Sequence, residues 1–265
     1  MSDMYLSGST CSLRGRERDE IEETFRYAPA AGYKYWGLGG PFTWSPGLIQ
    51  WLDIDKIRRR MAEIGLETLT EVWTPPITTE NNEEAIILGA QHVVMSARVA
   101  VELGCNRIVQ TGGSRRERGI QQTIYGLRKL LDLIKDLHVR ICLEPHINSQ
   151  ILYPEDYDVI FAHLNTPKIG ITVDTGHFHT AGVDWKALIR KYPEKIYNVH
   201  LKDHIGSQSV TIGQGEIDLP GLITVLREVD YHGPLAVELE VKDPENLPHY
   251  IRESYVYMTK LIGEQ

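Results

Sequence analysis

A chain of 265 residues with 42% hydrophobic content is long enough to bury one large core. Its formal net charge of −8 at pH 7 argues against a broad electrostatic surface for nucleic acid. The three cysteines form no zinc-finger pattern, and the sequence has neither a secretory signal nor an apolar run of membrane-spanning length. We therefore expect one domain over residues 1–265, cytoplasmic, with no nucleic-acid or membrane partner.

Short apolar runs alternate with longer amphipathic segments along the whole chain. Strands are predicted at residues 4–9, 33–38, 66–73, 106–113, 139–146, 168–177, 195–203 and 234–240. Helices are predicted at residues 16–31, 53–65, 82–103, 120–137, 184–192, 218–229 and 244–262, and in a shorter segment after Pro154.

This alternation predicts a parallel sheet of an α/β protein. Eight strand–helix units in roughly 250 residues is the usual size of a (β/α)8, or TIM, barrel. The rival architecture is an open doubly wound sheet, which a glycine-rich phosphate loop after the first strand would favour. Residues 6–20, "LSGSTCSLRGRERDE", fit neither the dinucleotide-binding pattern nor the P-loop pattern. The prediction is therefore a single TIM barrel.

Four consecutive predicted strands end in residues that bind metals in other proteins. These residues are Glu144, Asp174, His200 and Glu238. Their separations are each close to the roughly 30 residues that one strand–helix unit occupies, so the side chains should meet at the mouth of the barrel. Taken singly, each carboxylate is also explained as a helix cap or a salt-bridge partner, and the histidine as a hydrogen-bonded core residue. The common spacing favours one shared site.

Three carboxylates converging without a cation would repel one another and raise one another's pKa. A divalent metal ion removes that repulsion. Three oxygen ligands and one imidazole form a fairly hard site, for which we predict Mn²⁺ first, with Mg²⁺, Co²⁺ or Zn²⁺ as alternatives.

Residues 140–243 resemble the xylose-isomerase-like barrel superfamily, in its sugar isomerase and epimerase group. The resemblance rests on "LEPH", "VDTGHFHTAGVD", "VHLKD", "GQGEID" and "YHGPLAVELEVKDPEN". The group includes hydroxypyruvate isomerase, ketose 3-epimerases, inosose dehydratase and the catalytic subunit of C-glycoside deglycosidases. The resemblance implies that the metal ligands fall on the same four residues and that His177 contacts substrate. It favours Glu238 over Glu240, which faces the same side of its strand.

The sequence departs from the epimerases in two places. They carry a substrate-orienting Arg after the ligand equivalent to His200, where this chain has Lys202, Asp203 and His204; we expect Lys202 to contact substrate. "LEPH" also places His146 two residues beyond Glu144, where it could act as an acid or base or form a loop hydrogen bond. The residues of these motifs resemble those of inosose dehydratase and of the C-glycoside deglycosidases more closely. Endonuclease IV, a distant relative with many more histidine ligands and a basic groove, does not fit.

The resemblance implies removal of a proton α to the carbonyl of a keto-sugar or related polyol ketone, through an enediolate. Glu144 and Glu238 would exchange that proton, which makes the protein a metal-dependent isomerase or epimerase. A lyase or dehydratase that eliminates from a 3-oxo sugar is the first alternative, and a non-catalytic sugar-binding protein is the second. We expect a homo-oligomer, or a complex with a small subunit if the protein is a C-glycoside deglycosidase.

Other residues leave their alternatives open. Trp36, Trp44 and Trp73 lie at or after the ends of the second and third predicted strands and would stack on a sugar or pack in the core or in an oligomer contact. Gly213 and Gly215 should permit a close turn beside the site, and we expect His179 to stabilise a loop. The remaining group, Arg115, Arg116 and Arg118, would hold a phosphate or carboxylate or lie in a solvated loop.

Overall fold

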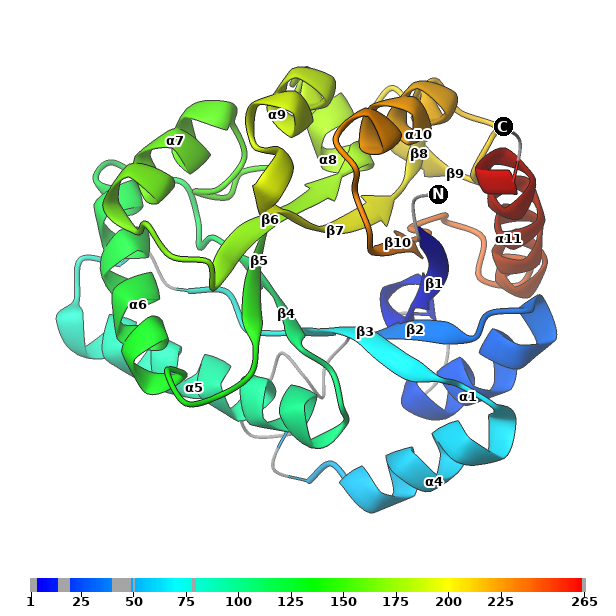
Figure 1. The fold of residues 1–265 in the computed structure, drawn as a ribbon, viewed down its shortest axis with the longest axis horizontal. Helices are drawn as coiled ribbons and strands as arrows, with labels where there is room; N and C mark the ends of the chain where they lie inside the picture. Colours follow the sequence, from blue (N-terminus) through cyan, green and yellow to red (C-terminus); the bar gives the residue numbers. More distant parts are fainter. Residues whose placement is uncertain (1–3, 14–19, 40–48, 50, 78–79, 264–265) are drawn as a thin grey trace.

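The computed structural model describes residues 4–13, 20–39, 49, 51–77 and 80–263. Among these residues, parallel strands close into the predicted TIM barrel, in the order β1, β2, β3, β4, β5, β6, β7 and β10 (Figure 1). The strands are β1 Tyr5–Ser9, β2 Tyr35–Leu38, β3 Thr68–Trp73, β4 Arg107–Thr111, β5 Arg140–Glu144, β6 Ile169–Asp174, β7 Ile196–Leu201 and β10 Pro234–Val237.

Helices surround the barrel and cover the outer face of its strands (Figure 1). They are α1 Glu20–Ala31, α4 Ile54–Ile64, α5 Glu83–Glu102, α6 Gly119–Leu133, α7 Pro154–His163, α9 Trp185–Lys191, α10 Leu219–Glu228 and α11 Leu247–Gly263, with short 3₁₀ turns at Thr10–Leu13 and Pro193–Lys195. Aspartates begin several of them. Asp184 accepts from the Ala187 amide at the start of α9, and Asp218 accepts from the Gly221 amide at the start of α10.

The helix α5 is long and apolar enough, by length and composition, to cross a membrane. In the barrel it packs against β3, β4 and α6. Its side chains Ile86, Ala90, Val93 and Ala97 are buried in the core. Barrel packing therefore accounts for the apolar face of this helix.

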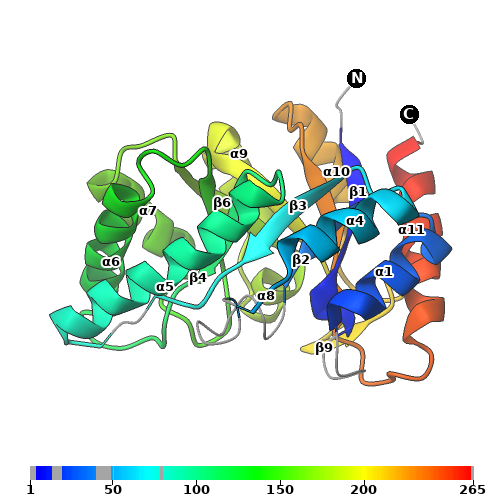
Figure 2. The same cartoon turned by 90° about the horizontal axis from the view of Figure 1, so that it is seen from below.

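Two elements at the carboxyl end of the strands were not predicted. The helix α8, Thr175–Thr180, follows β6 at once and is capped by Asp174, whose Oδ1 accepts from the His177 amide at 2.8 Å. An antiparallel hairpin, β8 Asp203–Ile205 and β9 Gln208–Val210, follows β7. Figure 2 shows α8 and β9 at the same end of the barrel. They frame the region where chemistry gathers in this fold.

Candidate metal centre and active site

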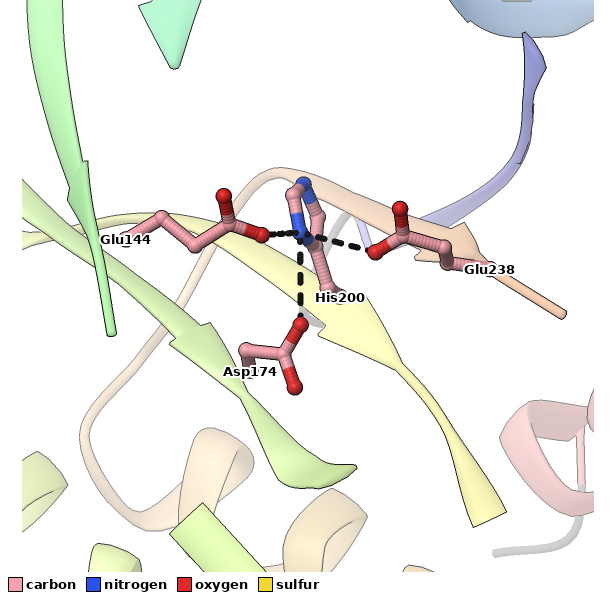
Figure 3. Close-up of side chains that lie close together, drawn as sticks. All are labelled: Glu144, Asp174, His200 and Glu238. Atoms are coloured by element: carbon pink, nitrogen blue, oxygen red, sulfur yellow. Dashed lines mark hydrogen bonds and ion pairs between the residues drawn. The ribbon is translucent and has the colours of Figure 1, made fainter. Parts of the chain in front are cut away.

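Four buried side chains converge at the carboxyl end of the barrel (Figure 3). Glu144 and Asp174 end β5 and β6, His200 lies near the end of β7, and Glu238 directly follows β10. Their candidate ligand atoms all lie within 4.8 Å of one another. His200 Nδ1 lies 2.7 Å from Glu144 Oε1, 3.3 Å from Glu238 Oε2 and 3.7 Å from Asp174 Oδ2. The four residues predicted from strand spacing are therefore together in space.

The donor set fits a divalent cation. Among the described residues, the buried Glu144 Oε2 and Glu238 Oε1 have neither a hydrogen bond nor an ion pair, and the buried Asp174 Oδ2 and Glu238 Oε2 have only ion pairs, with His200 and Lys202. Leaving a buried carboxylate oxygen without a partner is unfavourable. Carboxylates and one imidazole are ligands that Mn²⁺, Mg²⁺, Co²⁺ and Zn²⁺ all accept. A cation held by these four side chains would complete the coordination of those oxygens.

The Lys202 ammonium lies at the edge of this cluster, and its side chain is buried. Its Nζ is 3.2 Å from Asp174 Oδ2, 3.2 Å from Glu238 Oε2 and 3.1 Å from Glu240 Oε2. Burial alone would lower the pKa of Lys202, but the charges of these carboxylates outweigh it and raise that pKa well above its ordinary value. The ammonium therefore stays charged and offsets part of the acidic cluster.

The two glutamates differ in pKa, because both are buried but Lys202 lies next to Glu238. Burial raises the pKa of Glu144 to about 7, against the opposing charge of His200. Burial would also raise the pKa of Glu238, but the charges of Lys202 and His200 lower it to about 2. Without a metal ion, Glu144 is thus the carboxylate in this pair that more readily carries a proton.

His146 and His177 lie in contact beyond the metal ligands, with their ring centroids 4.2 Å apart. His177 is buried on α8, and its Nε2 is 3.4 Å from Lys202 Nζ. Burial lowers the pKa of His177 to about 3, so this ring is neutral and offers hydrogen bonds rather than charge. His146 is exposed, and its Nδ1 lies 3.0 Å from the Ile147 carbonyl oxygen.

A pocket of about 270 Å³ opens beside Glu144. Among the described residues, its lining combines the apolar side chains of Trp73, Pro76 and Val109 with the polar side chains of Thr74, Thr111, Glu144 and His146. An apolar pocket with a few convergent polar groups is the usual form of a small-molecule site. The pocket therefore gives a ligand a place next to the candidate metal centre.

Sequence reasoning missed Glu71 and Asn198. Glu71 is fully buried on β3, and its Oε2 lies 2.9 Å from His200 Nε2. Asn198 Nδ2 donates to Glu71 Oε2 and lies 3.0 Å from His200 Nε2. One signal was available, because Asn198 stands two residues before His200 and so faces the same side of the strand. Nothing local linked Glu71 to a histidine on a distant strand.

The predicted aromatic residues have different positions. Trp73 lines the pocket, stacks on the His200 ring at 5.5 Å between centroids, and donates from Nε1 to Glu71 Oε1 at 3.0 Å. Its contact with substrate stays a prediction. Trp36 is fully buried in the core and donates to Thr10 Oγ1 at 3.1 Å, so the sugar-stacking alternative is wrong for it. Trp44 lies outside the described residues.

Arg115 has a structural role. Its Nε donates to the Ser149 carbonyl oxygen at 3.0 Å, and its guanidinium pairs with Asp156 in the first turn of α7. These bonds hold the loop that follows β5, so the phosphate-binding alternative is not supported for Arg115. The exposed side chains of Arg116 and Arg118 favour the solvated-loop alternative.

Asp203 organises the loop that contains the predicted close turn. Its Oδ2 accepts from the Gly213 and Gly215 amides at 2.9 and 2.8 Å, and its Oδ1 accepts from Ile217 N at 3.2 Å. Gly213 has φ +88°, and a β-carbon on Gly215 would lie 2.1 Å from Asp203 Oδ1. The turn therefore needs both glycines, as predicted. His179 contacts the same loop, with Nε2 3.6 Å from Glu216 Oε2.

Asp203→Ala is expected to lower the free energy of unfolding by about 3 kcal/mol, because it removes three hydrogen bonds that each contribute about 1 kcal/mol, two from part-buried glycine amides and one from the buried Ile217 amide. Chemical denaturation measures this loss. Asp218→Ala, which removes an exposed helix cap, serves as the control with an expected loss of about 1 kcal/mol. Equal losses in the two variants would contradict the organising role of Asp203.

The fold and this site define a class. A family model described as a xylose isomerase-like TIM barrel matches residues 25–261. The chain belongs to that family.

Individual relatives are more distant. The inosose dehydratase of Clostridium tetani (strain Massachusetts / E88) is 29% identical over 139 residues, which cover 45% of this chain and 46% of the relative. The matched stretch thus spans about half the length of that protein. The D-allulose 3-epimerase from Methylomonas sp., solved in complex with D-allulose, has a TM-score of 0.81 at 16% identity and covers 98% of both chains. The IOLI protein, solved with a bound zinc atom, has a TM-score of 0.79 at 17% identity and covers 99% of this chain and 98% of its own. At such identities the two structures establish the fold.

Proposed function

We propose that this protein is a divalent-metal-dependent enzyme that removes a proton α to the carbonyl of a keto-sugar or related polyol ketone. The carrying observation is the buried cluster of Glu144, Asp174, His200 and Glu238 at the carboxyl end of the barrel. It adjoins a pocket of sufficient size for a small ligand. The names of its relatives, an inosose dehydratase and a D-allulose 3-epimerase, support chemistry at such a carbon.

The side chains divide the work of such a reaction. When bound, the cation would supply Lewis acidity to a substrate oxygen. Glu144 and Glu238 approach His200 Nδ1 from opposite sides (Figure 3), which suits removal of a proton by one carboxylate and its return by the other. The Lys202 ammonium would stabilise negative charge that develops on a substrate oxygen, and the neutral His177 ring would offer that oxygen a hydrogen bond.

The cation is proposed to be Mn²⁺, because oxygen ligands predominate in the set; Mg²⁺, Co²⁺ and Zn²⁺ are the alternatives to compare.

Return of the proton to the same carbon gives epimerisation, and its return to the neighbouring carbon gives isomerisation. We also propose that the chain forms a homo-oligomer, or a complex with a small subunit if it is a C-glycoside deglycosidase.

The test is hydrogen exchange in D₂O, followed by NMR, with the Mn²⁺-loaded protein removed before measurement. The panel comprises keto-sugars, keto-inositols and 3-oxo-glycosides. We expect deuterium at the carbon next to the carbonyl of at least one compound, and no exchange after chelation of the metal. Metal binding without exchange across the panel would favour the sugar-binding alternative. Turnover with complete retention of the substrate hydrogen would contradict proton abstraction.

Elimination is the second candidate, and the position of His146 favours it. This exposed imidazole lines the pocket together with Glu144 and contacts His177. A dehydratase or lyase must protonate a leaving group, and an accessible imidazole is suited to that transfer. An isomerase or epimerase has no leaving group and does not need this proton donor.

Replacing His146 separates these outcomes. For elimination, His146→Ala is expected to keep the metal and lower turnover at least about 10²-fold, with α-proton exchange partly retained. The control is His163→Ala, another exposed histidine, which lies at the end of α7. Elimination at the wild-type rate in His146→Ala would make His146 structural. A parallel loss of exchange and turnover would place it in the proton-abstraction step.

A further inference from the structure

We propose that Glu71 is a positioning residue that fixes His200 as an Nδ1 ligand of the cation. The inference rests on the proposed metal centre and adds a residue from a distant strand to it. His200 turns Nδ1 toward Glu144, Asp174 and Glu238. Its other nitrogen, Nε2, lies 2.9 Å from Glu71 Oε2. An imidazole that keeps its single proton on Nε2, held by a carboxylate, presents the Nδ1 lone pair to a metal ion.

The contact crosses the interior of the barrel. Glu71 lies on β3 and His200 on β7, which are not neighbours in the strand order. The side chains of both residues are fully buried. The carboxylate therefore contacts the ring at Nε2, on the side opposite to the cluster.

Glu71 is itself held in place. Trp73 Nε1 donates to its Oε1 at 3.0 Å, and Asn198 Nδ2 donates to its Oε2. A β-carbon on Gly37 would lie 2.5 Å from Glu71 Oε1, so the absence of a side chain there makes room for the carboxylate. Trp73 also stacks on His200 with an angle of 8° between the ring planes. The carboxylate and the imidazole are thus oriented by the same indole.

Glu71 is placed to act through His200 rather than as a further ligand. It reaches Nε2, whereas the cluster surrounds Nδ1 on the other side of the five-membered ring. A carboxylate in this position accepts a hydrogen bond from the Nε2–H group and increases the basicity of Nδ1. Glutamine would weaken both effects, because its amide nitrogen could donate to Nε2 and favour a proton on Nδ1, where the cation should bind.

The experiment compares wild-type protein with Glu71→Gln and with Thr70→Val. Thr70 is the neighbouring residue on β3, and its hydroxyl bonds to Ser7 at 2.7 Å, so Thr70→Val removes a buried hydrogen bond without touching His200. Calorimetry measures the affinity for Mn²⁺ and Zn²⁺ added alone. NMR of ¹⁵N-histidine-labelled, Zn²⁺-loaded protein identifies the nitrogen of His200 that carries the proton.

We expect Glu71→Gln to weaken metal binding about 10- to 100-fold, and Thr70→Val to leave it within about threefold of wild type. The Zn²⁺-loaded wild type should show a proton on Nε2 and the metal on Nδ1. Wild-type affinity in Glu71→Gln, or a proton on Nδ1 in the Zn²⁺-loaded wild type, would overturn the role of Glu71 while leaving the metal centre intact. A wild type that binds no divalent cation would instead overturn the metal centre, and this proposal with it.

Discussion

Asp174→Asn is expected to reduce metal affinity at least about 10²-fold and to bring activity to background. Loss of a residue that only supports a ligand weakens metal binding about 10- to 100-fold, and Asp174 is proposed as a direct ligand. The substitution removes the charge but keeps a side-chain oxygen. That oxygen can still accept a hydrogen bond from the His177 amide, which lies 2.8 Å from Asp174 Oδ1 in the wild type. The cap of α8 should therefore persist, and the Lys202 ammonium keeps Glu238 and Glu240 as charged partners, so we expect the barrel to remain folded.

The matched control is Asp184→Asn. Asp184 caps α9 in the same way, by accepting from the Ala187 amide at 3.0 Å, and lies on no element of the cluster. Metal content by elemental analysis and thermal unfolding are measured for both variants. Full metal occupancy in Asp174→Asn would remove Asp174 from the ligand set.

Lys202→Met is expected to lower turnover by about 10²- to 10³-fold while the cation still binds, since the loss of one preorganised donor to a developing negative charge has an effect of this size. Lys202 is a cleaner test of the chemical step than either glutamate, because Glu144 and Glu238 are also proposed ligands. The ratio of exchange rates in D₂O, measured at saturating Mn²⁺, gives the effect.

The same substitution makes a second measurement informative. Lys202 is the buried partner of Asp174 and Glu238, and removal of one partner from a buried ion pair destabilises a protein by about 3–5 kcal/mol. The metal-free variant should lose stability on this scale and regain much of it when Mn²⁺ is added. Lys186→Met, which breaks the more exposed pair with Asp218, is the control with a loss of at most about 1 kcal/mol.

For the exchange experiment, a rate in Lys202→Met close to that of the wild type would contradict the role of Lys202 in the reaction.

The sequence allowed the barrel and the four ligands to be predicted because both depend on regular spacing. Strand–helix alternation predicts the fold, and residues at the ends of successive parallel strands must meet at one end of it. Asp174 and His200 illustrate this, since they are register partners on β6 and β7. Local pattern and topology are sufficient for such residues.

Glu71 and Lys202 show where that reasoning ends. Glu71 stands in the middle of β3, where no unit spacing marks it, and its partner His200 is far away in sequence. We predicted contact of Lys202 with substrate because it stands near the place of the Arg of the epimerases, but not the course of its long side chain between Asp174 and Glu238. Both positions depend on how side chains fill the barrel interior, which periodicity does not describe.

The helix α8 was missed for a related reason. Asp174 ends the strand β6, caps the helix α8 and belongs to the candidate ligand set. Its interpretation as a ligand left no reason to expect a helix cap, and the short segment "TGHFHT" has no helical pattern of apolar residues. For Trp36 the sequence left both stacking on a sugar and packing in the core open, and the structure shows it buried in the core.

Anomalous diffraction from crystals grown with Mn²⁺, collected at the manganese absorption edge, tests the metal centre most directly. We expect one strong peak per chain, within bonding distance of His200 Nδ1 and of carboxylate oxygens from Glu144, Asp174 and Glu238. A peak elsewhere, or no peak among these side chains at saturating Mn²⁺, would contradict it.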